Sequence, residues 1–158
     1  MDFVRDHVPE KHPDKQPLIA LLQQSFPSNE FNVWGVPAGA SSIIRSLDVG
    51  DYMLLVESVH FPDGYIPALC PVKVFIKSEF PELSFALWQS SHYPFVFFFN
   101  TISLDLSWFE FLEHVGYKDN FNPRGKVYRI AEKRLARFGG YGGYIHHLQR
   151  NHSKNCGS

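Results

Sequence analysis

The N-terminal part of the chain has apolar residues at helical spacing. In residues 14–26, Leu18, Leu21 and Leu22 fall on one helical face, and Asp14 is a potential N-cap ahead of them. FNVW then has the pattern of a short strand, and the small residues of VPAGASS interrupt it before IIRSL. We therefore expect an N-terminal helix, a strand, a loop and one short helical turn.

The middle of the chain predicts strands joined by turns. DYMLLVES is typical of a buried strand, and GYIPALCPVKVFIKS predicts one long strand bent at Pro67 and Pro71. Turn residues in HFPDG join these two segments into a hairpin. PELSFALWQSS fits either a helix after Pro81 or a strand, whereas YPFVFFFN predicts an apolar strand that TISLDL continues.

The C-terminal third begins with a helix signal. SWFE matches the Ser-x-x-Glu capping box, so Ser107 is expected to begin a helix that Gly116 ends. VYRI fits a strand or a helix start, and AEKRLARF predicts a short basic helix. The run FGGYGGY predicts a flexible turn, with glycine–aromatic stacking as the alternative.

Together these segments predict an α+β fold. About six short strands and three to five short helices fit a small curved sheet or barrel with helices at its edges. The chain has 158 residues, of which 44% are hydrophobic, enough to bury the core of a single domain over residues 1–150. Residues 151–158, NHSKNCGS, are polar and predict a loose tail or the boundary of a longer protein.

Composition and charge narrow the function classes. No apolar stretch approaches the ~20 residues of a membrane helix, and the charged start is unlike a secretory signal, so we expect a cytoplasmic protein without a membrane partner. The formal net charge is −1, but residues 1–117 hold 6 Lys+Arg against 14 Asp+Glu, and residues 118–158 hold 9 against 2. A basic C-terminal segment is typical of a polyanionic partner or of a solvated surface.

The sequence carries no enzyme signature that we recognise. It lacks GxSxG, HExxH and P-loop patterns. Asp48 with Asp51, or Glu110 with Glu113, would be an acid–base pair, but helix caps and solvated faces explain them equally. Cys70 and Cys156 form no CxxC pair, and the adjacent His146 and His147 would point apart. We therefore predict a protein that is not an enzyme and has no metal site and no cofactor.

Two tryptophans stand where a ligand could reach them. Trp34 ends a strand at a loop of small residues, and Trp88 precedes the polar break Gln89–Tyr93. Aromatic faces in such places stack on bases, each worth ~1–3 kcal/mol, although both residues also fit an ordinary core. Trp108, inside the predicted capped helix, fits the core best.

A family resemblance adds to this pattern. The motifs are Val33–Trp34, the loop Gly35–Ser42, Gly50–Asp51 and Gly64–Tyr65–Ile66, followed by LSFALWQSSHYPFVFFF with Trp88. Residues 31–105 resemble the nucleotide-reading part of EVE and YTH domains in the PUA-like superfamily. They are most similar to the N-terminal DNA-recognition domain of McrB-like proteins in modification-dependent restriction.

The resemblance implies a reader that flips a methylated base of DNA into an aromatic cage. Trp34 and Trp88 would be two walls, and Tyr93 or Tyr65 a third. Hydrogen bonds to the base edge would come from polar groups near the cage, namely Asn32, Gly35, Ser41 and Ser42. A GTPase or AAA+ motor and a nuclease would lie on other domains or subunits.

Phosphate contacts are expected from the basic segment or from the loop at 58–64. Six residues cluster in the segment: Arg124, Lys126, Arg129, Lys133, Arg134 and Arg137. Three alternatives stay open: a reader of methylated RNA, a small enzyme and a protein-interaction domain with a Phe-rich surface.

Overall fold

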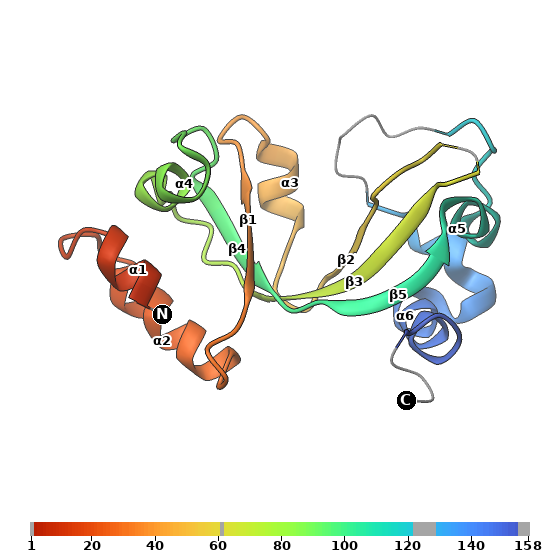
Figure 1. The fold of residues 1–158 in the computed structure, drawn as a ribbon, viewed down its shortest axis with the longest axis horizontal. Coiled ribbons are helices and arrows are strands. Elements are labelled where there is room, and N and C mark those ends of the chain that lie inside the picture. Colours follow the sequence, from red (N-terminus) through yellow and green to blue (C-terminus); the bar gives the residue numbers. More distant parts are fainter. Residues whose placement is uncertain (1, 61, 122–128, 155–158) are drawn as a thin grey trace. The chain divides into compact units, whose positions relative to one another are not determined.

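A computed structural model describes residues 2–60, 62–121 and 129–154 of the protein (Figure 1). Figure 1 labels the elements, whose bounds are as follows. The order is α1 (Asp2–His7), α2 (Lys15–Ser25), β1 (Asn32–Val36), α3 (Ser41–Ser46), β2 (Tyr52–Leu55), β3 (Tyr65–Val74), α4 (Pro81–Trp88), β4 (Phe95–Phe99), β5 (Ile102–Ser107), α5 (Trp108–Val115), the 3-10 helix η1 (Glu132–Phe138) and α6 (Gly140–Asn151).

The strands within the described residues form a five-stranded antiparallel sheet that does not close. The order is β1-β4-β3-β2, and β5 also pairs with β3. β4 pairs with β3 at Val72 and Val74, whereas β5 pairs with it between Tyr65 and Leu69. β4 and β5 therefore pair with successive parts of β3. This agrees with the prediction that TISLDL continues the apolar strand YPFVFFFN. The coarse α+β class is confirmed, but the predicted barrel is not, and the described residues contain five strands where about six were expected.

The chain divides into two compact units, each built from two separated segments. The first unit comprises Met1–Asp51 and Pro71–Asn100, and the second comprises Tyr52–Cys70 and Thr101–Ser158. β3 contributes its C-terminal part to the first unit and its N-terminal part to the second. Each unit has its own hydrophobic cluster, so we describe them one at a time.

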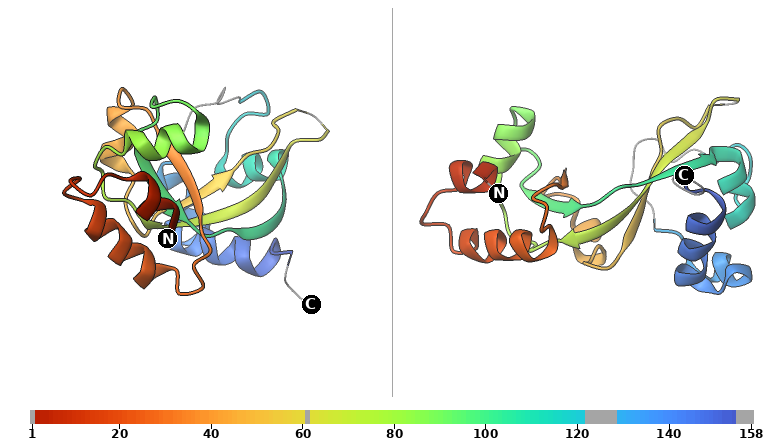
Figure 2. Two further views of the ribbon diagram at one scale, coloured as in Figure 1. Left: turned by 60° about the vertical axis from the view of Figure 1, so that its left-hand side comes forward. Right: turned by 60° about the horizontal axis from the view of Figure 1, so that its bottom comes forward.

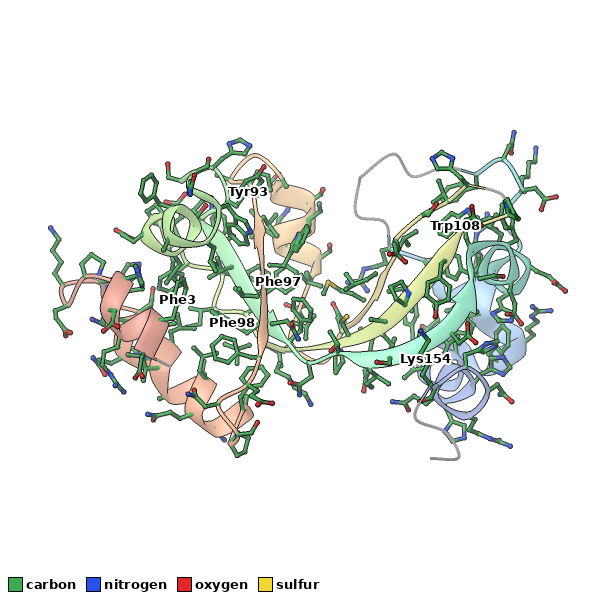
Figure 3. All side chains as sticks on the ribbon, in the orientation of Figure 1. Phe3, Tyr93, Phe97, Phe98, Trp108 and Lys154 are labelled. Carbon is green, nitrogen blue, oxygen red and sulfur yellow. The ribbon has the colours of Figure 1, made fainter. Side chains whose placement is uncertain are left out.

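In the first unit, helices cover both faces of β1 and β4. α1, α2 and α4 lie on one side of these strands and α3 lies on the other (Figure 1). α1 contacts both α2 and α4 (Figure 2). Successive residues of a strand point to opposite faces, and Phe97 and Phe98 accordingly leave β4 in opposite directions (Figure 3). Phe98 packs with the helices in a core that includes Val4, Leu18, Leu22, Leu83 and Val96.

The predicted N-terminal helix is confirmed as α2, with one change in its apolar face. Leu18 and Leu22 are buried as expected, but Ile19 joins them and Leu21 is 41% exposed. The Lys15 side chain is also buried. Its Nζ donates to the carbonyl of Arg5 at 2.9 Å and to Oε1 of Glu10 at 2.7 Å, so the buried ammonium is paired.

In the second unit, α5, η1 and α6 pack against β3 and β5. The core includes Ile66, Leu104, Leu106, Trp108, Leu135 and Leu148. Ser153 pairs with Leu104, and the Lys154 amide donates to the carbonyl of Ser103 at 3.1 Å. The start of the predicted loose tail is therefore attached to β5, whereas residues 155–158 lie outside the described part.

Local signals account for the ends of α4 and α5. The Ser107 hydroxyl accepts from the Glu110 amide at 3.0 Å, and Gly116 ends α5 with φ 73°, so the capping prediction is confirmed. The open choice for PELSFALWQSS resolves to a helix, α4, that begins at Pro81 and ends at Gln89 with φ 56°.

Two sequence predictions are wrong in detail. The strand in DYMLLVES, β2, is partly exposed rather than buried, because it lies at the end of the sheet order. The run FGGYGGY is not a flexible turn. Gly139, with φ 93°, ends η1, and Gly140, Gly142 and Gly143 belong to the helix α6.

Across the described ranges, no helix combines the length and the apolar character needed to span a bilayer. The longest helix in these ranges, α6, has 12 residues and carries one arginine and two histidines. A membrane-spanning helix needs ~20 predominantly apolar residues.

Candidate functional site

β1 places Trp34 and Gly35 on opposite faces of the first unit's strands. Val33 packs against the helical core, and its neighbour Trp34 points to the other face, beside the cross-strand partner Phe97. The Trp34 side chain is 55% exposed. A tryptophan on a strand is normally well buried, so this indole is an accessible aromatic surface.

Trp88 and Tyr93 pack together on the Gly35 side of β1. Their ring centroids are 5.7 Å apart in a T-shaped arrangement. A Cβ added to Gly35 would lie 2.7 Å from Cζ3 of Trp88 and 2.7 Å from Cβ of Tyr93. The Tyr93 amide donates to the Ser84 hydroxyl at 3.0 Å, which helps to hold the polar break in place. Glycine at position 35 therefore makes room for this aromatic pair.

The structure does not bring Trp34 to Trp88. Because the Trp88 ring covers Gly35, the alternation along β1 puts Trp34 on the opposite face. Tyr65 belongs to the second unit, where its hydroxyl donates to the Leu104 carbonyl at 2.8 Å. Of the four predicted cage residues, only Trp88 and Tyr93 are in contact in the structure.

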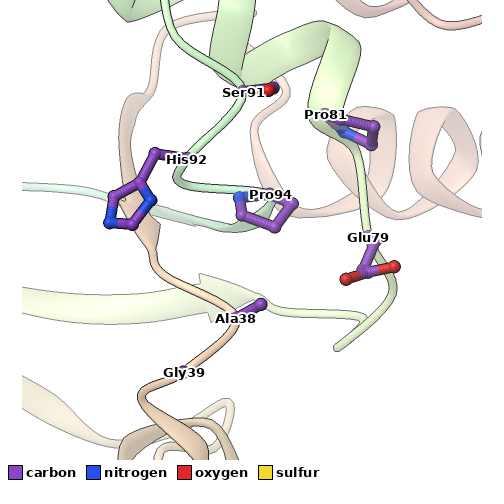
Figure 4. Close-up of a pocket in the computed structure, with 7 residues that line it drawn as sticks. All are labelled: Ala38, Gly39, Glu79, Pro81, Ser91, His92 and Pro94. Carbon is purple, nitrogen blue, oxygen red and sulfur yellow. The ribbon is translucent and has the colours of Figure 1, made fainter.

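The predicted small-residue loop lines a surface pocket of about 420 Å³ in the first unit (Figure 4). Ala38 and Gly39 form one side, and Ser91 and His92 of the polar break, together with the following Pro94, contribute another. Glu79 and Pro81 complete the lining. The volume is within the range of small-molecule pockets, although neither Trp34 nor Trp88 is part of its lining.

The predicted base-edge groups lie on β1 and α3. Asn32 is exposed and, two residues before Trp34, shares its face of the strand. Ser41 and Ser42 are exposed at the start of α3, where Ala40 is the N-cap and no side chain caps the helix. These three side chains thus lie at the surface of the first unit.

Two arginines of the basic segment support α5. Arg134 Nη1 donates to the carbonyls of Val115 and Gly116, both at 3.2 Å, and its guanidinium lies 4.5 Å from the Tyr117 ring centroid. Arg137 Nη2 donates to the Glu113 carbonyl at 3.3 Å. Cations at a helix C-terminus satisfy its free carbonyls and interact favourably with its dipole.

Of the other four members of the basic segment, two lie within the described residues. Lys133 and Arg129 are exposed. Arg124 and Lys126 lie outside the described residues. A solvated surface and a phosphate contact both remain compatible with Lys133, whereas Arg134 and Arg137 already have structural contacts.

Three of the four carboxylates considered for an acid–base pair have structural partners, namely Asp48, Asp51 and Glu110. Asp48 Oδ1 lies 2.7 Å from Lys77 Nζ, and Asp51 Oδ2 accepts from the Asp48 amide at 2.9 Å. Glu110 belongs to the capping box and its Oε1 lies 3.8 Å from His152 Nε2. Cys70 is fully buried, and burial raises the pKa of its thiol to about 11, which leaves it unreactive at neutral pH.

Sequence reasoning missed a cluster of three histidines in the second unit. His114 of α5, His147 of α6 and His152 just after α6 each place a ligand nitrogen within 4.8 Å of the other two. Their ring centroids are 5.3–5.7 Å apart. The adjacent pair His146 and His147 drew attention in the sequence, but His146 is exposed and is not part of this cluster.

The rings of this histidine cluster are held through their Nδ1 atoms. His114 Nδ1 lies 2.9 Å from the Tyr144 hydroxyl, and His152 Nδ1 lies 3.2 Å from the Asp105 carbonyl oxygen. Burial is the largest cause that lowers the pKa of His114 to about 4, and the nearby His147, His152 and Arg137 lower it further. Burial also raises the pKa of Tyr144, so its hydroxyl stays protonated.

One sequence signal did point toward the histidine cluster. Glu110 and His114 are four residues apart, which places both on the same face of a helix. His147 and His152 are five residues apart at a helix end, a spacing that by itself predicts no shared site. Only the packing of α6 against α5 shows that these pairs belong together.

Comparison with known proteins returned no similar protein for this chain: no family model, curated protein or solved structure matches it. The resemblance to EVE and YTH domains therefore rests on the residues quoted for it. The functional proposals below are therefore based on the exposed Trp34 of the first unit and on the histidine cluster of the second unit.

Gly35→Ala tests the packing around Trp88 and Tyr93. Because the new Cβ would lie 2.7 Å from two side-chain atoms, we expect a loss of about 1–3 kcal/mol in the free energy of unfolding, measured by urea denaturation. Gly39→Ala is the matched control, since a Cβ there meets nothing within 4 Å. Equal stability of the two variants would contradict the close packing over Gly35.

Proposed function

We propose that the first unit binds nucleic acid through the exposed face of Trp34, and that the ligand is DNA carrying a modified base. The observation that carries this proposal is the 55% exposure of an indole on β1. Base–aromatic stacking is worth ~1–3 kcal/mol per base, which makes such a surface useful for a base that has left the duplex. The resemblance to modified-base readers supplies the choice of ligand.

The geometry favours one-sided stacking over a cage. With Trp88 on the other face of β1, a base on Trp34 has a single tryptophan beside it. Asn32 lies on the same face and offers an amide to the base edge. Burying one methyl group contributes about 0.8 kcal/mol, so we expect a roughly fourfold preference for the methylated base rather than strict selection.

A separate electrostatic contribution to affinity would come from exposed cations of the second unit such as Lys133. Arg134 and Arg137 hold the end of α5, so replacing them would weaken the fold as well as any binding. Lys133→Ala is therefore the cleaner test of an electrostatic contribution. One lost phosphate contact reduces the slope of log affinity against log salt by about 1.

Binding is tested by titrating the chain with matched DNA oligonucleotides that carry N6-methyladenine, 5-methylcytosine, 5-hydroxymethylcytosine or no modification, with RNA equivalents alongside. The affinities of the wild-type chain and of each variant are read from the fluorescence anisotropy of a dye on the oligonucleotide, so that the readout does not depend on Trp34. We expect Trp34→Ala to weaken binding about 5- to 150-fold, because the stacking energy is lost.

Phe85→Ala is the control for this titration. Phe85 is another exposed aromatic of the first unit, 62% accessible and on α4, so its loss should leave affinity unchanged. Equal affinity of wild type and Trp34→Ala would overturn the proposal. Tighter binding of methylated RNA than of methylated DNA would favour the RNA alternative. In that case the expected GTPase and nuclease partners would also be rejected, because they belong to the DNA hypothesis.

A further inference from the structure

We propose that His114, His147 and His152 form a zinc-binding site in the second unit, with Glu110 as the fourth ligand. The site is independent of the proposed base-binding surface, which lies in the first unit. Three imidazoles and one carboxylate are a ligand set that Zn²⁺ takes in proteins. Nothing in the proposed binding of nucleic acid requires this site.

The positions of the three histidines carry the argument, and Glu110 is added because its carboxylate lies beside one of them, His152. The three histidine ligand atoms lie within 4.8 Å of one another, and Glu110 Oε1 lies 3.8 Å from His152 Nε2. Zinc at ~2.0–2.1 Å from each ligand in a tetrahedron places the ligands about 3.4 Å apart. The imidazoles therefore need to move inward by about 1 Å or less each, which small side-chain rotations supply.

The hydrogen bonds orient the rings as metal ligands. A carbonyl oxygen only accepts, so the contact of His152 Nδ1 with Asp105 places the proton on Nδ1 and leaves a lone pair on Nε2. His114 Nδ1 lies 2.9 Å from the Tyr144 hydroxyl, a contact that also fixes the orientation of this ring. The Asn151 amide donates to His147 Nδ1 at 3.2 Å, so zinc binding through Nε2 of His147 requires the ring proton to move to Nδ1 and this contact to break.

The charges around the histidine cluster are also compatible with a metal ion bound to unprotonated imidazole rings. The three rings repel one another when protonated, and burial lowers the pKa of His114 and His147, which keeps their lone pairs free. Arg137 opposes a metal ion, since its charge also acts on His114. The Glu110 carboxylate supplies the one negative ligand and offsets this arginine.

The proposed zinc would join elements that are far apart in the sequence. Glu110 and His114 come from α5, His147 from α6, and His152 from the residue that follows α6 and pairs with β5. A bound ion would therefore hold the C-terminal helix against α5. Its binding energy would appear as added stability of the folded chain.

The experiment uses the full chain with Cys156→Ser, so that this thiol cannot bind zinc, after dialysis against a chelator. Adding Zn²⁺ at one hundred times its dissociation constant should raise the melting temperature by about 5–10 °C. Titration should give one ion per chain. Co²⁺ should give the visible absorption of a tetrahedral nitrogen and oxygen site.

Single variants decide whether the binding uses this histidine cluster. His114→Ala, His147→Ala and His152→Ala should each lower zinc affinity roughly 100-fold or more, and Glu110→Gln roughly 10-fold. His146→Ala, on the same helix as His147 but outside the cluster, should bind as wild type does. If a ligand variant fails to fold, zinc-induced shifts of the imidazole nitrogens in NMR spectra of the wild-type chain replace it.

Two outcomes would overturn the proposal. The first is the absence of any zinc-dependent change in melting temperature or imidazole nitrogen shifts. The second is zinc binding that survives in the three histidine variants, which would show adventitious surface binding.

Discussion

Trp108→Ala is expected to lower the free energy of unfolding by about 3–5 kcal/mol, the largest effect that we foresee for a single substitution. The indole is 2% exposed and lies in the core of the second unit, with the Phe111 ring centroid 5.3 Å away. Its backbone amide donates to the Gly64 carbonyl at 3.0 Å. Small domains are stable by about 5–15 kcal/mol, so this loss would leave the chain close to unfolding.

Trp108→Phe is the matched control for this prediction. Phenylalanine keeps an aromatic ring in the core and removes the Nε1–H group, which is buried and has no hydrogen-bond partner among the described residues. We expect a loss below about 1.5 kcal/mol, because the buried donor no longer needs a partner. Urea denaturation followed by circular dichroism compares the two variants. A loss as large in Trp108→Phe as in Trp108→Ala would mean that the indole nitrogen, not the ring, is what the core needs.

The second large effect concerns two neighbouring glycines of α6. A Cβ on Gly143 would lie 1.7 Å from the Phe138 carbonyl oxygen and 2.7 Å from its carbonyl carbon. These are backbone atoms, so the end of η1 must move away from the helix. We expect Gly143→Ala to lower the free energy of unfolding by about 3 kcal/mol, at the upper end of the usual cost of overpacking.

Gly142→Ala is expected to have the opposite sign. A Cβ there meets nothing within 4 Å, and alanine in a helix is more favourable than glycine by about 0.8–1.0 kcal/mol. Thermal denaturation of the two single variants gives the comparison. If Gly143→Ala were also stabilised, α6 would not approach the carbonyl of Phe138 as closely as the structure places it.

The sequence was most informative where the deciding groups are close neighbours in the chain. Ser107 with Glu110, and Gly116 at the helix end, each act within one turn, so their patterns predict α5 without knowledge of the fold. Pro81 is also a local signal, but the sequence around it left helix and strand open. The failures involve wider context. Ile19 is buried and Leu21 is exposed, the reverse of the prediction for Leu21, because the neighbouring helices and strands decide which side of α2 is covered.

The candidate sites also contain features that the sequence shows locally and features that depend on contacts between distant residues. The sequence identified Trp34, the small-residue loop and the polar break near Trp88 as unusual, and the structure places them in one unit. It could not show that the two tryptophans face opposite ways. That result depends on the register of β1 against β4 and on the Trp88 ring over Gly35, contacts between residues more than 50 positions apart.

By itself the sequence determined the α+β class, the positions of most helices and strands, and the ends of α5. Spacing, caps and turn residues encode these features locally. Only the tertiary structure decided which side chains meet. His114 joins His147 and His152 because α6 packs against α5 across more than 30 residues of chain, and no local pattern records that contact.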